Sequence, residues 1–73
     1  MTTIKQPKET LRLARNLRRL RDASGESAYA LARRIGISLQ TYLNWEHGKR
    51  TPRWDLVCWM ADAMEVSTEE FRK

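Results

Sequence analysis

Hydrophobic residues recur along this chain at the spacing of α-helices. Leu13, Leu17 and Leu20 are three to four residues apart and form one apolar face of a first helix. Alternation of apolar and polar residues, typical of strands, is absent. The pattern predicts four helices and a short fifth one, at residues 9–24, 28–35, 39–47, 52–64 and 68–72. We therefore expect an all-α fold, a compact domain of four to five helices.

Glycine, serine and proline mark the predicted helix ends. Glycines follow the first three helices, where a left-handed backbone favours glycine: Gly25, Gly36 and Gly48. Serines stand at N-cap positions before the second, third and fifth helices: Ser27, Ser38 and Ser67. Thr51 followed by Pro52 predicts a capped start of the fourth helix, because proline at the first helical position loses no hydrogen bond.

The length of 73 residues allows one domain with a small core. Residues 1–8 lack a core pattern and are expected to form a flexible N-terminal arm, before a single domain at residues 9–73. No apolar run approaches the roughly 20 residues of a membrane helix, and no signal-peptide core follows the N-terminus. The lone Cys58 suits a reducing compartment, so we expect a cytoplasmic protein.

The residues that carry chemistry are sparse. Cys58 and His47 cannot together build a Cys/His zinc site, so we expect no metal and no cofactor. No Ser/His/Asp spacing, glycine-rich phosphate loop or carboxylate pair indicates catalysis. We therefore expect no enzyme and no catalytic residue.

The net charge of +5 lies in the first third of the chain. Residues 1–24 hold seven of the 14 Lys and Arg residues and two of the nine acids, whereas the remainder is balanced. Opposite the leucines lies a basic ridge of Lys8, Arg12, Arg15 and Arg19. The excess indicates a polyanionic partner, either nucleic acid or an acidic membrane surface, although a solvated helix face has the same pattern. The leucine face carries no Trp or Phe, which favours packing against other helices.

Two short helices joined by a tight turn are predicted within residues 27–48, SAYALARRIGISLQTYLNWEHG. Gly36 can supply the positive φ of the turn, and Ile37 can fill the corner between the helices. Ala32 is small enough for the helices to approach closely. This arrangement is typical of a helix-turn-helix, which holds its second helix in the DNA major groove.

The chain resembles the Cro/repressor-type helix-turn-helix regulators, the xenobiotic-response-element family. The resemblance covers about three quarters of the chain without insertion or deletion. It rests on Leu17-Arg18-Arg19-Leu20-Arg21, Gly25, Ser27, Leu31-Ala32, Gly36-Ile37-Ser38, Thr41-Tyr42, Trp45-Glu46-His47-Gly48, Lys49-Arg50, Pro52, Trp54, Val57, Ala61, Met64, Val66-Ser67 and Phe71. It implies a repressor-like domain that binds double-stranded DNA, commonly as a homodimer.

The resemblance also indicates which face of the third helix is buried. By spacing alone, Leu39, Tyr42 and Leu43 make the best apolar stripe. The family instead buries the positions of Tyr42 and Trp45, which leaves both leucines on the shoulder of the helix. There they either contact thymine methyl groups or form the edge of the core.

Gln40, Asn44 and His47 then face outward. The resemblance implies that Gln40 and Asn44 read bases, since an amide side chain can bond adenine N6 and N7. His47 is expected on the surface or facing a phosphate. Phosphate contacts are implied for Lys49, Arg50, Arg53, Thr41, Ala28 and Tyr29. The family commonly has glutamine at Ala28, so the contact there falls to the main chain and the Tyr29 hydroxyl.

Two further positions concern the fold. The family often pairs the residues matching Arg21 and Glu46, which implies a structural ion pair between the first and third helices rather than a DNA contact by Arg21. Glu65 stands where the family usually has a cap glycine. A side chain there is either strained by about 1 kcal/mol, or the helix ends differently.

The fourth helix suggests a surface for a protein partner. The family buries the positions of Trp54, Val57, Ala61 and Met64. Leu56 and Trp59 fall where it usually has polar residues, so they are expected to form a dimer or partner surface. The alternative is that Trp59 folds back over a small core.

The leading interpretation is a sequence-specific DNA-binding transcriptional regulator, a repressor that acts as a homodimer and inserts residues 39–47 in the major groove. The alternative is an antitoxin-like or adaptor protein that binds a partner protein through residues 52–64. A membrane-surface peptide built on the basic first helix is a third hypothesis, and an enzyme is the last.

Overall fold

The computed structural model describes residues 8–73, with side chains from Thr10 onward. It contains four α-helices and one 3-10 helix: α1 (Lys8–Ser24), α2 (Ala28–Ile35), α3 (Leu39–Glu46), α4 (Trp54–Met64) and η1 (Thr68–Phe71). No strand occurs in this range, and the all-α prediction is confirmed. The expected N-terminal arm lies outside the described residues, except for Lys8, which begins α1.

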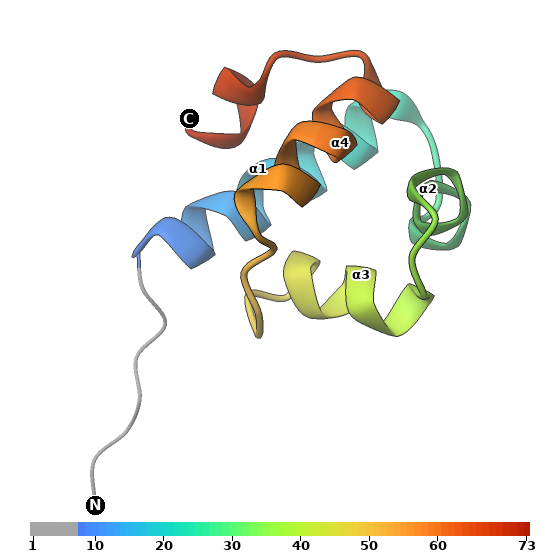
Figure 1. The fold of residues 1–73 in the computed structure, drawn as a ribbon, viewed down its shortest axis with the longest axis horizontal. Coiled ribbons are helices and arrows are strands. Elements are labelled where there is room, and N and C mark those ends of the chain that lie inside the picture. Colours follow the sequence, from blue (N-terminus) through green and yellow to red (C-terminus); the bar gives the residue numbers. More distant parts are fainter. Residues whose placement is uncertain (1–7) are drawn as a thin grey trace, which may run out of the picture.

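The helices form a compact domain around α1 (Figure 1). α1 contacts α3 and η1, and α2 packs against both α3 and α4. η1 also packs against α4, so the segment after Met64 returns to the body of the domain. α3 lies along one edge of the domain, with α2 beyond its N-terminal end (Figure 1).

The predicted N-caps are confirmed. Side-chain oxygens of Ser27 and Ser38 accept hydrogen bonds from the main-chain N–H groups of Ala30 and Thr41, at 3.0 and 3.1 Å. Ser67 caps η1 in the same way through Glu69 N–H, at 3.1 Å. These bonds satisfy N–H groups that have no partner in the first turn of a helix. The starts of these helices could therefore be predicted from the neighbouring residues alone.

The predicted start of the fourth helix is wrong by two residues. α4 begins at Trp54, and its N-cap is Arg53, which makes no side-chain cap hydrogen bond. The Thr51 hydroxyl is instead hydrogen-bonded to the Thr10 hydroxyl of α1, and Pro52 is buried. Thr51 therefore attaches the loop to α1, and neither Thr51 nor Pro52 starts the helix.

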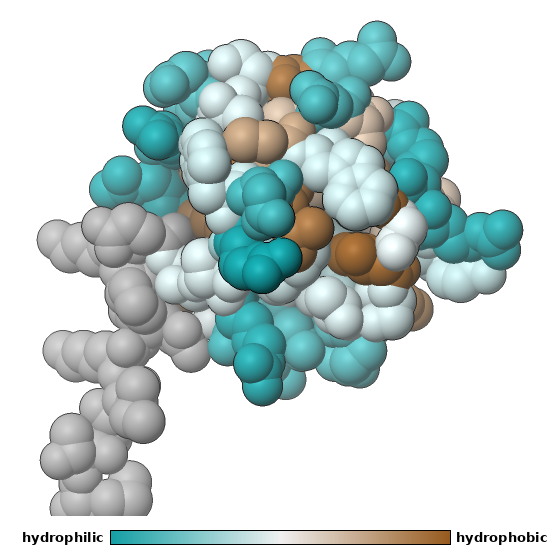
Figure 2. All heavy atoms as spheres, in the orientation of Figure 1, coloured by the Kyte–Doolittle hydropathy of each residue, from teal (hydrophilic) through white to brown (hydrophobic). Residues whose placement is uncertain are grey.

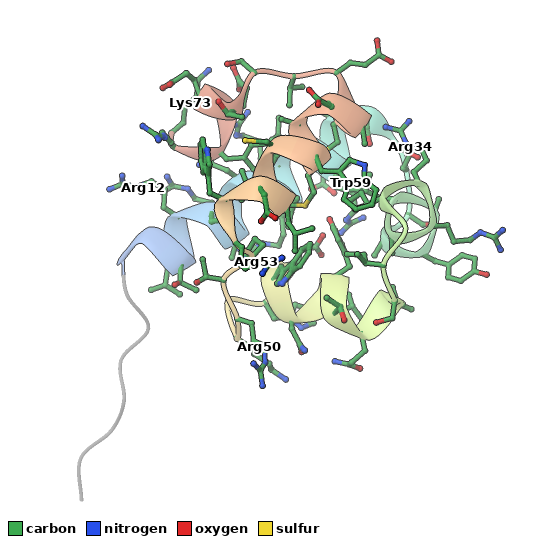
Figure 3. The ribbon with its side chains drawn as sticks, in the orientation of Figure 1. Arg12, Arg34, Arg50, Arg53, Trp59 and Lys73 are labelled. Atoms are coloured by element: carbon green, nitrogen blue, oxygen red, sulfur yellow. The ribbon has the colours of Figure 1, made fainter. Side chains whose placement is uncertain are left out.

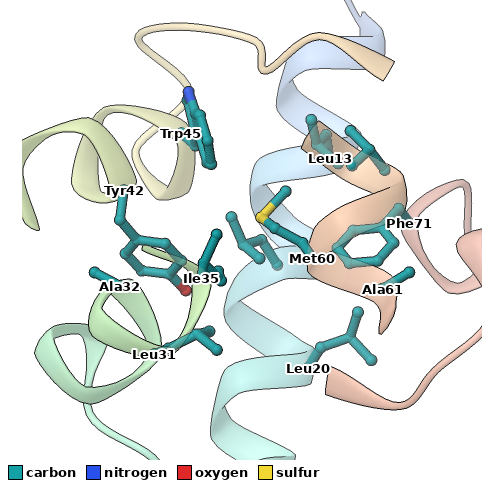
Figure 4. Packing of buried hydrophobic residues seen from close by; sticks show 12 residues of the cluster. Leu13, Leu20, Leu31, Ala32, Ile35, Tyr42, Trp45, Met60, Ala61 and Phe71 are labelled. Atoms are coloured by element: carbon teal, nitrogen blue, oxygen red, sulfur yellow. The ribbon is translucent and has the colours of Figure 1, made fainter. Parts of the chain in front are cut away.

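The predicted leucine face of α1 is buried, with Leu17 fully enclosed. It packs against apolar side chains from every other element (Figure 4). The core consists of Leu13, Leu17, Leu20, Leu31, Ala32, Ile35, Tyr42, Trp45, Val57, Met60, Ala61 and Phe71. Met64 is only half-buried at the edge of this cluster.

The expectation that Trp54 is buried is wrong, because 51% of its surface is exposed. Trp54 is the first residue of α4, and the Arg72 guanidinium lies over its ring, 5.0 Å from the centroid. A cation over an aromatic face is a favourable contact at the surface. The tryptophan therefore packs against an arginine at the rim of the core instead of entering it.

Glu65 adopts the left-handed conformation expected of a cap glycine, with φ 57° and ψ 42°. Its N–H donates to the carbonyl of Asp62 at 3.1 Å, and Val66 N–H donates to that of Ala61 at 2.9 Å. The helix thus ends as the family pattern implies, with a side chain where glycine is favoured. The left-handed backbone costs a residue with a Cβ about 1 kcal/mol.

We expect Glu65→Gly to raise the free energy of unfolding by on the order of 1 kcal/mol, because it removes this steric cost. In a domain of this size that corresponds to about 4–8 °C in Tm. Gly36→Ala is the matched control and should lower Tm. Gly36 has φ 90°, and a Cβ there would meet the Trp59 ring at an ordinary 3.7 Å, so backbone strain decides the sign. A lower Tm for Glu65→Gly would contradict the prediction that the left-handed backbone of Glu65 is strained.

Candidate nucleic-acid interface

The turn between α2 and α3 has the geometry predicted for a helix-turn-helix. Gly36 is left-handed, and the N–H groups of Gly36 and Ile37 both donate to the Ala32 carbonyl, at 2.9 and 3.0 Å. Ala32 is buried, which lets the helices approach, and Ile37 packs against the core from the corner. The angle between the helices is therefore set by main-chain hydrogen bonds and packing.

The C-terminal end of α3 is attached to α1 through Arg21 and Glu46. Arg21 donates from Nε to Glu46 Oε2 at 2.6 Å and from Nη2 to Oε1 at 3.0 Å. The Tyr42 hydroxyl donates to the same carboxylate at 2.6 Å. Arg18 donates to the Glu46 main-chain carbonyl, also at 2.6 Å. Four donors thus hold one residue at the end of α3.

Burial and hydrogen bonding oppose each other at this carboxylate. Burial disfavours the charged form of Glu46, but the hydrogen bonds from Arg21 and Tyr42 outweigh it and hold the pKa of Glu46 below its ordinary value. The hydrogen bond to Glu46 raises the pKa of Arg21, and burial followed by that same carboxylate raises the pKa of Tyr42. Near neutral pH the cluster is therefore an ionised pair with a neutral tyrosine.

The exposed face of α3 carries the two amide side chains. Gln40 is exposed and Asn44 half-buried, and Gln40 Nε2 donates to Asn44 Oδ1 at 3.1 Å. The structure separates the two leucines, because Leu39 is 38% exposed whereas Leu43 packs against the core. Tyr42 and Trp45 are buried, as the resemblance implied.

The loop after α3 carries exposed cations on an ordered backbone. The N–H groups of Lys49 and Arg50 donate to the Asn44 carbonyl at 2.8 and 3.2 Å, and both side chains are exposed. Arg50 projects beyond α3, away from the body of the domain (Figure 3). Arg53 is exposed beside Asp55, with 3.4 Å between its Nη2 and the carboxylate.

The expected phosphate contacts outside this loop lie at the starts of α2 and α3. Ala28 is half-buried, and Tyr29 is exposed with its hydroxyl accepting from Arg33 at 3.2 Å. The Thr41 hydroxyl accepts from the Ser38 hydroxyl at 2.9 Å, so it takes part in the cap of α3. These residues belong to one helix-turn-helix but form a group separate from the loop after α3.

The two residues expected to form a partner surface on α4, Leu56 and Trp59, differ in exposure. Leu56 is half-buried and packs against the core. Trp59 is 49% exposed, and its ring lies 3.7 Å from the point where a Cβ on Gly36 would stand, so it covers the turn between α2 and α3. Figure 3 shows Trp59 directed toward that turn, and Figure 2 shows apolar side chains interspersed with polar ones over this face. Trp59 is therefore the main exposed apolar residue of the pair.

Sequence reasoning missed the role of two arginines on α1. Arg15 donates to the main-chain oxygen of Lys73 at 2.9 Å, and Arg19 donates to that of Glu70 at 2.9 Å. The Glu70 carboxylate also lies 3.4 Å from Arg19 and 3.0 Å from Lys73. Part of the basic ridge thus fixes η1. The acidic Glu69-Glu70 pair in the sequence was the available signal.

Among residues 8–73, no group of three or more His, Cys, Asp or Glu side chains could hold a metal ion. None of the helices there is long and apolar enough to cross a membrane.

A short helix pair joined by a left-handed glycine, with its second helix exposed and flanked by cations, defines the protein as a helix-turn-helix domain of the Cro/repressor-like kind. A family model described as a helix-turn-helix domain matches residues 12–73. The chain belongs to this family of DNA-binding domains.

The fold also resembles a solved structure. The crystal structure of a hypothetical transcription factor, NHTF, from Neisseria superposes with a TM-score of 0.80 and 24% sequence identity. The match covers 97% of this chain and 85% of the other. At this identity the likeness concerns the fold alone. No curated protein matches the chain.

Proposed function

We propose that the protein is a sequence-specific regulator of transcription that inserts α3 in the major groove of double-stranded DNA and acts as a repressor. The observation that carries the proposal is the pair of amide side chains, Gln40 and Asn44, on the exposed face of a helix whose far end is fixed to α1. A rigid helix keeps its amides in register with base edges, which bidentate recognition of adenine requires.

Leu39 and the loop cations support the same assignment. Leu39 is exposed beside Gln40 and could contact a thymine methyl group. We assign phosphate contacts to the loop residues Lys49, Arg50 and Arg53. A second group, at the starts of α2 and α3, consists of main-chain N–H groups around Ala28 and the hydroxyls of Tyr29 and Thr41.

We propose a homodimer as the binding unit, with Trp59 as an anchor of the interface, because a half-exposed tryptophan is a frequent centre of protein association. Two-fold symmetry would place the half-sites about 34 Å apart on DNA. The same exposure of Trp59 supports the second candidate function, an antitoxin-like or adaptor protein that grips another protein through α4.

Selection of duplexes from a random pool tests the proposal. The full chain is expected to enrich one motif arranged as an inverted repeat, with half-sites about one helical turn apart. Its affinity should fall steeply with salt, since each neutralised phosphate contributes about −0.9 to the log–log slope. Absence of any enriched motif, with little response to salt, would overturn the regulator. Enrichment of a single asymmetric half-site would overturn the dimer.

A further inference from the structure

A basic hollow lies between α1 and the C-terminal end of α3, apart from the amide face. It has a volume of about 440 Å³ and is lined by Leu11, Arg12, Ala14, Arg15, Arg18 and His47. Three arginine residues and one histidine thus line one concave surface. No carboxylate is among the described residues that line it.

The walls of the basic hollow are fixed by the fold. Gly48 is buried where α3 meets α1, and a Cβ there would stand 3.3 Å from Leu11 Cδ2 and 3.8 Å from Ala14 Cβ. The close approach brings the end of α3 against α1. Arg18 adds the hydrogen bond to the Glu46 carbonyl at 2.6 Å, directly before His47. The hollow therefore has its shape without a ligand.

The cations of the basic hollow remain available to an anion. Among the side chains of residues 10–73, none of Arg12, Arg15 and Arg18 forms an ion pair with a side-chain carboxylate. Arg15 uses its Nη2 for the Lys73 main-chain oxygen and Arg18 its Nη1 for that of Glu46. Since a guanidinium has five N–H donors, each retains several.

We propose that the basic hollow binds a phosphate group. Guanidinium groups present paired donors that match phosphate oxygens, and three of them with no lining carboxylate favour a multiply charged anion. His47 directly precedes Gly48, Lys49 and Arg50, so the hollow continues the cationic loop around the end of α3 onto α1. Arg12 projects outward from α1 in Figure 3.

The phosphate has two possible sources. One is the DNA backbone beyond the base pairs that α3 reads, which rests on the proposed function. The other is a free polyphosphate, which does not. In either case the basic hollow gives a role to Arg12, Arg15 and Arg18, which are part of the positive charge concentrated on α1.

The first arm of the test uses Arg12→Gln and Arg15→Gln in the full chain. Each is expected to reduce the log–log salt slope by about 1 on a duplex extended by about 10 bp beyond the selected motif, and to have no effect on the unextended motif. Arg72→Gln is the control, because it removes the same charge from a side chain that covers Trp54. Unchanged Tm values establish that the variants fold.

The second arm titrates inorganic tripolyphosphate and follows the NMR signals of the His47 ring and the Arg18 side chain. Shifts that disappear in Arg12→Gln and Arg15→Gln, but persist in Arg72→Gln, indicate a free polyphosphate. Reduced slopes without such shifts indicate the DNA backbone. A wild-type chain that selects a motif, with unchanged slopes and no shifts, overturns the hollow as a phosphate site. A chain that selects no motif overturns only the proposed function, since the tripolyphosphate arm still decides the hollow.

Discussion

Replacing Arg21 with alanine is expected to lower the free energy of unfolding by about 3 kcal/mol. The Glu46 carboxylate is buried and accepts two of its hydrogen bonds from Arg21, at 2.6 and 3.0 Å. Without them the charge stays buried with Tyr42 as its only side-chain donor among the described residues. The value is at the lower end for a broken buried pair, because the Arg21 side chain is 22% exposed and water replaces it in part.

Urea unfolding followed by tryptophan fluorescence measures this loss. Arg15→Ala is the matched control on the same helix, and it should cost no more than about 1 kcal/mol, because it removes one exposed hydrogen bond, to the Lys73 main-chain oxygen. If Arg21→Ala is unfolded in water, Arg21→Lys provides the measurement, since it keeps the charge and loses the paired geometry. Equal losses for the Arg21 and Arg15 variants would contradict a structural role of the pair.

The pH dependence of the same difference tests the electrostatic cause. The folded pKa of Glu46 lies below its ordinary value, so its contribution is complete above the unfolded pKa of about 4.3 and is lost as pH falls through the folded pKa. In Arg21→Ala the hydrogen bonds from Arg21, which hold the pKa of Glu46 down, are lost. Burial then raises the pKa of Glu46. The difference between wild type and variant is therefore largest near neutral pH and shrinks in acid. A constant difference would show that lost packing, not charge, destabilises the variant.

The helices could be predicted from the sequence because their ends are determined locally. Ser27 and Ser38 bond main-chain groups three residues away, and Gly36 takes up its conformation because its neighbours in the chain require it. The start of α4 could not be predicted in this way, because the Thr51 hydroxyl bonds that of Thr10, which is 41 residues away in the chain. Nothing near Thr51 distinguishes this partner from a helix N-terminus.

The candidate site likewise contains features that the sequence predicts and features that depend on contacts between distant residues. The pairing of Arg21 with Glu46 followed from resemblance, because α1 has several arginines and only the packing of α3 selects one. Arg18 and Arg15 are both exposed arginines of α1, three residues apart, yet Arg18 bonds the end of α3 and Arg15 bonds Lys73, beyond η1. Likewise, Leu39 and Leu43 are one helical turn apart, and only packing places the second against the core. The basic hollow forms where α1 meets the end of α3, and this contact is not visible in the sequence.

Gln40→Ala and Asn44→Ala are each expected to relax one or two base positions of the selected motif, by roughly 1–3 kcal/mol per position. A lost amide removes discrimination only at the base that it contacts, so the other positions should keep their preferences. Repeating the selection with each variant measures this directly. Arg50→Ala is the control and should weaken all sequences alike and reduce the salt slope by about 1. A uniform loss in the amide variants would place these residues outside base recognition.

The hydrogen bond between the two amides makes their effects interdependent. Gln40 Nε2 donates to Asn44 Oδ1 at 3.1 Å, so one donor of Gln40 is occupied by its neighbour and orients the Asn44 amide. Gln40→Ala frees the Asn44 amide to rotate. The affinity lost in Gln40→Ala therefore already includes part of the loss that Asn44→Ala causes by itself. The double variant should therefore lose less affinity for the motif than the sum of the single variants, with a coupling of about 0.5 kcal/mol or more. Strict additivity would mean that each amide contacts its base independently and that the bond between them opens on DNA.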